Sequence, residues 1–323
     1  MSNTTITPSQ AAHSLADIRH QRLRACAELQ RHTNRTLVFA RSEALELLAI
    51  EKPNEPASER RRNGICDVIV ATKAEKTHLA GIRFLTWSGP IASITINRSV
   101  ECTTPVCTWA HYAAILPLSE LIVLGDSMMR RNRHLTRATP DDFHTYLTTD
   151  SQFAGIRRCR QALALMREGT DSSMETRTRL LPMQFGLPEL QVNHPVRLGN
   201  GRTVLLDMAY PELRIAVEYD GAYHRFSGEQ ALRDDKRREA LEDIGWIYIK
   251  VTFQDLIDEE AQERFVQRLA TRCEDVVGIP VPLMPRLTLE QVCDGRRLRK
   301  RPFWETVPRE HWTARWARER YRK

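Results

Sequence analysis

Two short apolar runs joined by a proline-containing turn constrain the fold of this chain more than any other feature. The runs cover 203–209 and 214–220, and Tyr210-Pro211-Glu212-Leu213 separates them, with the proline placed to bend the chain. Each run therefore predicts a strand. Alternate side chains of a strand point to opposite faces. We expect the second strand to divide its side chains into Ile215, Val217 and Tyr219 on one face, and Ala216, Glu218 and Asp220 on the other.

Carboxylates are concentrated on these two predicted strands. If the strands pair as a hairpin, Asp207 comes close to Glu218, and Asp220 lies at the same end of the small sheet. Like charges this close require a cation, and a hard divalent ion such as Mg2+, or Mn2+ in its place, takes oxygen ligands of this kind. The pattern predicts a metal site for phosphodiester hydrolysis, with Asp207, Glu218 and Asp220 as the ligands.

The sequence around this hairpin extends the pattern over about a third of the chain. A predicted helix carries Ser173-Met174-Glu175-Thr176, and Phe185-Gly186-Leu187-Pro188 follows it. The predicted strands 191–198 and 203–209 flank Gly199-Asn200-Gly201, a strong hairpin signal. After His224 come a charged helix at about 229–243, a buried strand at 246–251 and a helix at about 259–273. This stretch resembles the PD-(D/E)XK nuclease superfamily, in particular the endonuclease-like domain related to very-short-patch repair endonucleases.

The resemblance implies a restriction-endonuclease-like fold and a set of site residues. It implies catalytic roles for Glu175, Asp207, Glu218, Asp220 and His224, and it places Asp235 and Arg238 toward the site, in contact with nucleic acid. The chain departs from the family pattern at Asp220, which stands where the family has a lysine. The positive charge that this lysine would supply to the phosphate is open among His224, Lys236 and Lys250.

Several of these residues also have purely structural interpretations. Glu175 fits a capping box with Ser172, and His224 fits a loop histidine bonded to the backbone. Asp235 and Arg238 are one helical turn apart, so they fit a solvated ion pair worth a few tenths of a kcal/mol.

The net positive charge is confined to the end of the chain, because acidic and basic residues balance before Arg286. From Arg286 onward there are 12 Lys and Arg against 5 Asp and Glu, which accounts for the whole formal net charge of +7. Basic runs attract phosphates and interleaved tryptophans can stack on bases, so we expect the tail to contact nucleic acid. A solvated arm is the alternative. The predicted basic contacts are Lys250, Arg296, Arg297, Arg299, Lys300 and Arg301.

The first half of the chain predicts a different set of elements. They are a helix at about 11–30 and strands of alternating polarity near 66–71, 81–87 and 92–97. Short stretches such as Thr104-Pro105-Val106-Cys107-Thr108-Trp109 weakly resemble domains of abortive-infection-type antitoxins. His111 and Asp126 are expected to be structural. We therefore predict four parts, namely a helix at 1–35, an α+β domain at 36–150, the endonuclease-like domain at 165–275 and a basic tail at 280–323.

Composition excludes several classes of function. None of the runs approaches the roughly 18–20 apolar residues of a membrane span, and no secretory signal is apparent. Seven scattered cysteines without a C-x-x-C pair favour reduced thiols in a cytoplasmic protein. Phosphate-cradling glycine motifs are absent, as are a G-x-S-x-G motif and a cysteine with a base partner, which argues against nucleotide-driven and acyl-transfer chemistry.

The hypothesis from sequence is an α/β (α+β) protein with a metal-dependent endonuclease-like domain that hydrolyses DNA, in repair or in defence against foreign DNA. Two alternatives remain open. One is a non-catalytic DNA-binding regulator or antitoxin of a toxin–antitoxin system, and the other is a nuclease that acts on RNA.

Overall fold

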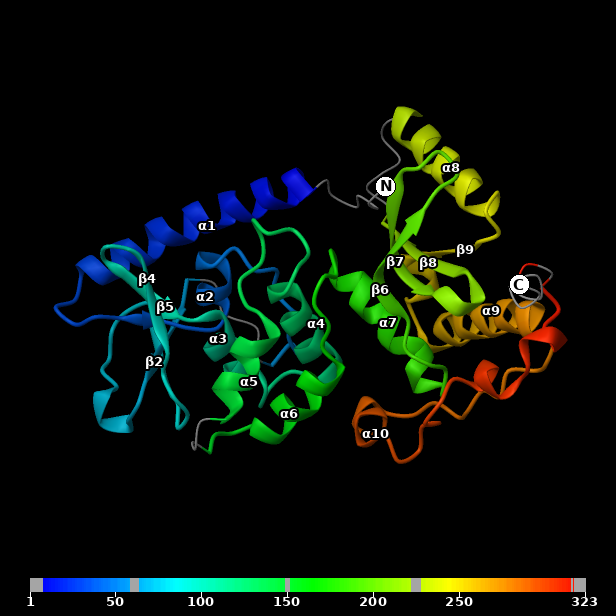
Figure 1. Ribbon diagram of the computed structural model, residues 1–323. Helices are drawn as coiled ribbons and strands as arrows, with labels where there is room; N and C mark the ends of the chain where they lie inside the picture. Colours follow the sequence, from blue (N-terminus) through cyan, green and yellow to red (C-terminus); the bar gives the residue numbers. More distant parts are fainter. Residues whose placement is uncertain (1–7, 59–63, 149–151, 222–227, 315, 317–323) are drawn as a thin grey trace. The chain divides into compact units, whose positions relative to one another are not determined.

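The computed structural model describes residues 8–58, 64–148, 152–221, 228–314 and 316 (Figure 1). The chain divides into an N-terminal unit, Pro8–Ser173, and a C-terminal unit that begins at Met174. Each unit has its own mixed sheet flanked by helices, so the predicted α+β class is confirmed.

The sheet of the N-terminal unit has the strand order β3-β2-β1-β5-β4. The sequence predicted three of these strands and missed β1 and β5, which are only two and four residues long, too short for a clear periodic signal. β1 is antiparallel to β2 and parallel to β5, so this two-residue strand joins the two halves of the sheet. The strands are β1 (Val38–Phe39), β2 (Cys66–Val70), β3 (Ile82–Thr86), β4 (Ser93–Asn97) and β5 (Val100–Thr103).

Six α-helices complete this unit within its described residues. α1 packs against α2 and β5, so the predicted separate helix at 1–35 is instead part of the N-terminal unit. Thr104 caps α3 by accepting a hydrogen bond from the Cys107 amide at 3.4 Å, with Pro105 at the first helical position. The helices are α1 (Pro8–Arg31), α2 (Ser42–Leu47), α3 (Pro105–Tyr112), α4 (Leu118–Met128), α5 (Pro140–Thr148) and α6 (Ile156–Leu165).

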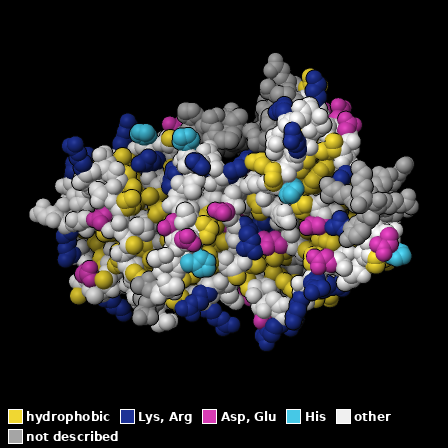
Figure 2. All heavy atoms as spheres, viewed as in Figure 1, with side chains coloured by type: hydrophobic (Ala, Val, Ile, Leu, Met, Phe, Trp, Pro, Cys, Tyr) yellow, Lys and Arg dark blue, Asp and Glu magenta, His cyan; other side chains and the backbone are white. Residues whose placement is uncertain are grey.

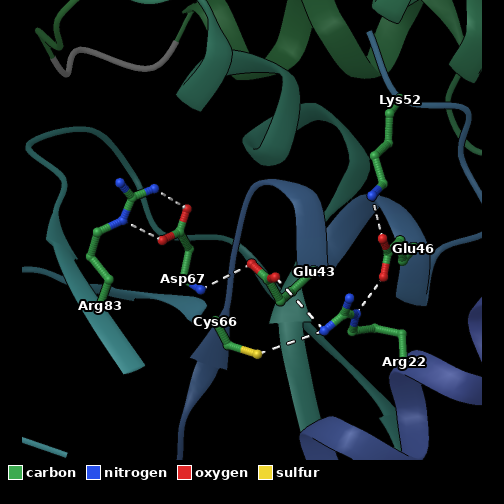
Figure 3. A network of polar contacts seen from close by, with 7 residues as sticks. All are labelled: Arg22, Glu43, Glu46, Lys52, Cys66, Asp67 and Arg83. Carbon is green, nitrogen blue, oxygen red and sulfur yellow. Dashed lines mark hydrogen bonds and ion pairs between the residues drawn. The ribbon is translucent and has the colours of Figure 1, made fainter. Parts of the chain in front are cut away.

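A polar network attaches α1 to α2 and to the start of β2 (Figure 3). Arg22 forms ion pairs with Glu43 and Glu46 and donates to the Cys66 thiol at 3.7 Å. Lys52 also pairs with Glu46. Burial by itself would raise the pKa of Glu46, but the hydrogen bonds from Arg22 and Lys52 outweigh it and lower that pKa. The Glu46 carboxylate therefore stays charged beneath α1.

Glu43 connects this network to β2. Its side chain is fully buried and accepts a hydrogen bond from the Asp67 amide at 2.9 Å. Asp67 in turn receives two hydrogen bonds from Arg83 on β3, at 2.6 and 2.8 Å. Each acidic side chain of the network thus faces a cation, as burial of charge requires.

The C-terminal unit is built on a four-stranded sheet in the order β6-β7-β8-β9. The first three strands are antiparallel neighbours, and β8 and β9 run parallel. Gly201, with φ of 82°, permits the tight predicted turn between β6 and β7. The predicted proline turn is a 3-10 helix at Pro211–Leu213. The strands are β6 (Gln191–Arg197), β7 (Thr203–Tyr210), β8 (Ile215–Asp220) and β9 (Ile247–Thr252).

Helices cover both faces of this sheet (Figure 1). Ile215, Val217 and Tyr219 pack in a large core with residues of α7 and α9, whereas Ala216 packs with Leu241 of α8 in a smaller core. The predicted division of the β8 side chains between two faces is therefore confirmed. The helices of this unit are α7 (Ser173–Gln184), α8 (Gly228–Glu242), α9 (Glu259–Val277) and α10 (Leu289–Asp294).

The tail is part of the C-terminal unit. Phe303, Trp304 and Trp312 are buried in its large core, and the Arg214 guanidinium lies 4.4 Å from the centroid of the Trp316 ring. The predicted separate tail at 280–323 is wrong in this respect, because burial of large aromatic surface holds the chain to the core. A solvated arm does not describe residues 303–312.

We expect Arg22→Met to destabilise the N-terminal unit by about 3–5 kcal/mol, because it leaves Glu43 and Glu46 with buried, poorly compensated charge. The matched control is Arg31→Met on the same helix, where the pair with Glu28 is solvent-exposed and worth at most about 1 kcal/mol. Urea denaturation of both variants measures the difference. Equal losses for the two variants would contradict a structural role for the network.

Candidate functional site

The predicted carboxylates lie on neighbouring strands of the C-terminal sheet. β7 and β8 pair with Met208 opposite Val217, and extending this register by one residue places Asp207 opposite Glu218. The Tyr219 amide donates to Oδ2 of Asp207 at 3.3 Å, which ties the Asp207 side chain to β8. In the parallel pair β8–β9, Lys250 lies beside Glu218. The sheet therefore gathers both charge types at one end.

Glu218 is enclosed by a second element, α8. Its side chain is almost fully buried, and Arg237 donates to Oε1 at 2.6 Å and to Oε2 at 3.1 Å. The Tyr248 hydroxyl donates to Oε2 at 3.0 Å. Burial and the nearby Glu218 carboxylate raise the pKa of Tyr248, so the phenol stays protonated and can donate. Both oxygens of Glu218 thus have donors.

Asp220 lies at the more open end of the cluster. It ends β8, about a quarter of its side chain is exposed, and it forms an ion pair with Lys250, whose side chain is half exposed. Of the three candidates for the positive charge, Lys250 is the one seen beside a predicted site carboxylate. Lys236 is exposed on α8, and His224 falls outside the described residues.

Carboxylate oxygens are suitable ligands for Mg2+, but the placement of these carboxylates does not suit a bound ion. Across the part of the chain that the structure describes, no group of three or more His, Cys, Asp or Glu side chains could hold a metal ion. Cations already neutralise two of the predicted ligands, Glu218 through Arg237 and Asp220 through Lys250. As placed, these carboxylates do not fit a bound divalent ion.

The remaining predicted site residues lie elsewhere. Glu175 is buried in the first turn of α7, which packs on the sheet face opposite α8. Asp235 and Arg238 form an exposed pair at 3.8 Å on α8, and Arg238 also lies 3.8 Å from Glu242. The exposed pair is the one that the structural interpretation anticipated, and contact of Asp235 and Arg238 with nucleic acid stays a prediction.

Arg237 is the functional candidate that sequence reasoning missed. It precedes the buried Leu241 by four residues and Arg238 precedes it by three, so both spacings fit the buried face of a helix. Arg237 takes the buried position and also donates to the Leu205 carbonyl at 2.6 Å. The spacing from Leu241 indicated that either Arg237 or Arg238 lies on the buried face of the helix. Tertiary packing determines that it is Arg237.

The basic run after α10 is accessible. Arg297, Arg299, Lys300 and Arg301 are exposed, and Arg296 is exposed but paired with Asp294 at 2.6 Å. Figure 2 shows Lys and Arg side chains gathered over α10 and the segment after it, near the lower edge of the view. This surface can attract phosphates while the aromatic residues of the tail stay buried in the core.

A cysteine with a histidine partner occurs in the N-terminal unit, contrary to the sequence analysis. Cys107 Sγ lies 3.5 Å from His111 Nε2, and the Tyr146 hydroxyl lies 3.6 Å from the same sulfur. Burial raises the pKa of Cys107 and lowers the pKa of His111 to about 3. The pair is therefore neutral and has no thiolate to act as a nucleophile. His111 is structural, as predicted.

Asp126 is structural as well. Its side chain is fully buried and accepts a hydrogen bond from the Arg167 amide at 2.8 Å. All seven cysteines are free thiols. Among the described helices, none combines the length and apolar character needed to cross a membrane.

Comparison with known proteins gives a partial match. The chain is 28% identical over 116 residues to uncharacterised proteins from two strains of Mycobacterium tuberculosis, CDC 1551 and H37Rv. The match covers 36% of this chain and 42% of each relative. No protein-family model and no solved structure matches the chain.

We expect Arg237→Met to destabilise the C-terminal unit by about 3–5 kcal/mol, because Glu218 would keep a buried charge without its cation. Arg238→Met, next to it on the exposed side of α8, should change stability by less than about 1 kcal/mol. Thermal and urea denaturation report both values. A variant Arg237→Met as stable as Arg238→Met would show that the buried pair contributes nothing.

The His111 pKa predicts a pH dependence of stability. The unfolded chain binds a proton at this residue below about pH 6.5, whereas the folded chain does so only near pH 3. Stability is therefore unaffected by His111 above pH 6.5 and falls by about 1.4 kcal/mol per pH unit as pH drops toward 3. The variant His111→Gln should lack this slope in urea denaturation at pH 6 and 5. Identical slopes, or an NMR titration of folded His111 near 6.5, would contradict the assignment.

Proposed function

We propose that the C-terminal unit is an endonuclease-like domain that hydrolyses phosphodiester bonds of DNA. One observation carries the proposal: Asp220 of β8 and Lys250 of β9 form a partly exposed pair, and the paired strands β7 and β8 also carry Asp207 and Glu218. At one open end of the sheet, a carboxylate can accept a proton from a water molecule while an ammonium group binds a phosphate. Arg297 and the basic residues after it add an accessible surface for the nucleic-acid backbone.

The chemistry assigned to these groups is hydrolysis by water. A carboxylate of Asp207 or Asp220 accepts a proton from the attacking water, and the water oxygen bonds to phosphorus. The bond to the ester oxygen of the leaving strand breaks, and that oxygen keeps the electron pair and takes a proton from solvent. Lys250 is placed to stabilise the negative charge that develops on the phosphate. Because Arg237 and Tyr248 hold both Glu218 oxygens, the proposal contains no metal-bound step. Whether cleavage depends on Mg2+ or Mn2+ is measured in the nicking assay described below.

A second function has its own observation. Glu218 is buried and fully paired, and Asp220 is paired with Lys250, so the cluster is close to electrically balanced. Such a surface repels phosphates less strongly than three unpaired carboxylates would. This favours a non-catalytic DNA-binding protein, of the regulator or antitoxin type, in which the fold serves as a platform.

A nicking assay separates the two functions. Supercoiled plasmid and a structured RNA are incubated with the protein in Mg2+, Mn2+ or chelator, beside Asp207→Asn, Lys250→Met and the control Asp235→Asn. The control removes an exposed carboxylate from α8. We expect cleavage of DNA by the wild type and by Asp235→Asn, and a loss of at least about 100-fold in Asp207→Asn and Lys250→Met.

Other results have defined meanings. Wild-type protein that binds DNA but cleaves neither substrate in any of the three conditions supports the non-catalytic platform. Cleavage of RNA alone changes the substrate and keeps the chemistry. Full activity of Asp207→Asn would overturn the assignment of the site. Melting curves of the variants show whether each one is folded.

A further inference from the structure

A small cavity lies between the loop after α7 and the basic run of the tail. Leu187, Pro188 and Phe303 contribute apolar surface to its lining, and Arg299, Lys300 and Arg301 also line it. We propose that this cavity binds one unpaired nucleotide of a DNA strand, with the base inside and the flanking phosphates on the three basic side chains. The proposal rests on the proposed action on DNA and names a contact for it away from the carboxylate cluster.

The size of the cavity limits what can enter it. Its volume is about 230 Å³. Cavities for complete small-molecule ligands are typically about 300–1,000 Å³, whereas a single buried water needs only about 10–15 Å³. The space is too small for an elaborate ligand and holds a single ring system. The rest of the ligand must lie outside, where the basic side chains are exposed.

The charges around the cavity favour an anionic ligand. Three consecutive cations line it, and the one acidic residue in its lining is Glu189. Arg179, which is fully buried, neutralises Glu189 through a contact of 2.6 Å. A ligand that joins a flat ring to negative charges on both sides suits this combination, and a nucleotide within a strand has both parts. Bases in a duplex are paired and stacked, so the ligand is single-stranded or extruded from the stack.

Both walls of the cavity are fixed to the core. The Met284 amide donates to the Phe185 carbonyl at 2.9 Å, and the Leu287 amide donates to the Gln184 carbonyl at 2.7 Å. Gly186 has φ of 79°, and an added Cβ would meet the Met284 side chain, so this turn requires glycine. Phe303 is buried in the large core. A preformed cavity avoids an ordering cost when the base enters.

The test compares two probes of equal charge. One is a ten-nucleotide single-stranded DNA, and the other is the same backbone with every base removed. Binding is measured by fluorescence anisotropy with chelator present, so that hydrolysis plays no part. We expect the natural oligonucleotide to bind about tenfold more tightly, since the stacking of a single base is enough to give a preference of this size.

Variants of the tail identify the cavity as the source of this preference. Leu298→Trp places a larger side chain in the lining and should abolish the preference for the natural oligonucleotide. Arg299→Ala/Arg301→Ala should weaken binding and reduce the preference. The matched control, Arg296→Ala/Arg297→Ala, removes two charges from the same run but none from the cavity lining. It should weaken binding to both probes equally and keep the preference.

Equal affinity of the wild type for the two probes, or absence of binding to either, would overturn the proposal. A preference that survives in Leu298→Trp and falls equally in both double variants would also overturn it. Thermal melts check that the tail remains docked in each variant. Failure of the nicking assay with an intact base preference would reject hydrolysis and keep the cavity, so the two proposals fail separately.

Discussion

The buried ion pair between Glu218 and Arg237 is the interaction on which the C-terminal unit depends. A carboxylate inside the small core between β8 and α8 would be very unfavourable by itself, and Arg237 compensates it with two hydrogen bonds. The same guanidinium bonds to the Leu205 carbonyl of β7. One side chain therefore fixes the orientation of α8 relative to two strands. It also decides which carboxylates are available for chemistry, because it removes Glu218 from solvent and leaves Asp220 beside Lys250 at the open end.

The N-terminal unit meets the same electrostatic requirement in a different way. Glu43 and Glu46 lie beneath α1, and Arg22 reaches both of them from that helix. The helix is held by charge pairing as well as by apolar packing, in which Cys26 is fully buried. Cys107 and His111 illustrate the opposite outcome. Without a countercharge that favours ionisation, burial keeps both groups neutral and removes the reactivity that their proximity alone would suggest.

The tail combines two roles that look incompatible in sequence. Trp304 and Trp312 are buried in the core, yet the basic residues shortly before them are exposed. Anchoring of the aromatic side chains fixes the position of the basic run against the loop after α7. A cavity with a charged lining results from this arrangement. A free arm with the same composition would offer phosphates only a diffuse positive charge.

The sequence by itself determined the order of the C-terminal elements and the faces of β8. Gly199-Asn200-Gly201, Pro211 and the alternation from Ile215 to Asp220 are local signals, and local backbone preferences act on them directly. Tertiary structure alone decided that Arg237 and not Arg238 meets Glu218, since both positions satisfy the helical spacing. It also decided that α1 belongs to the N-terminal unit and the tail to the C-terminal unit, that β1 and β5 exist, and that burial keeps Cys107 and His111 neutral. These outcomes depend on packing and on burial, which local backbone preferences do not encode.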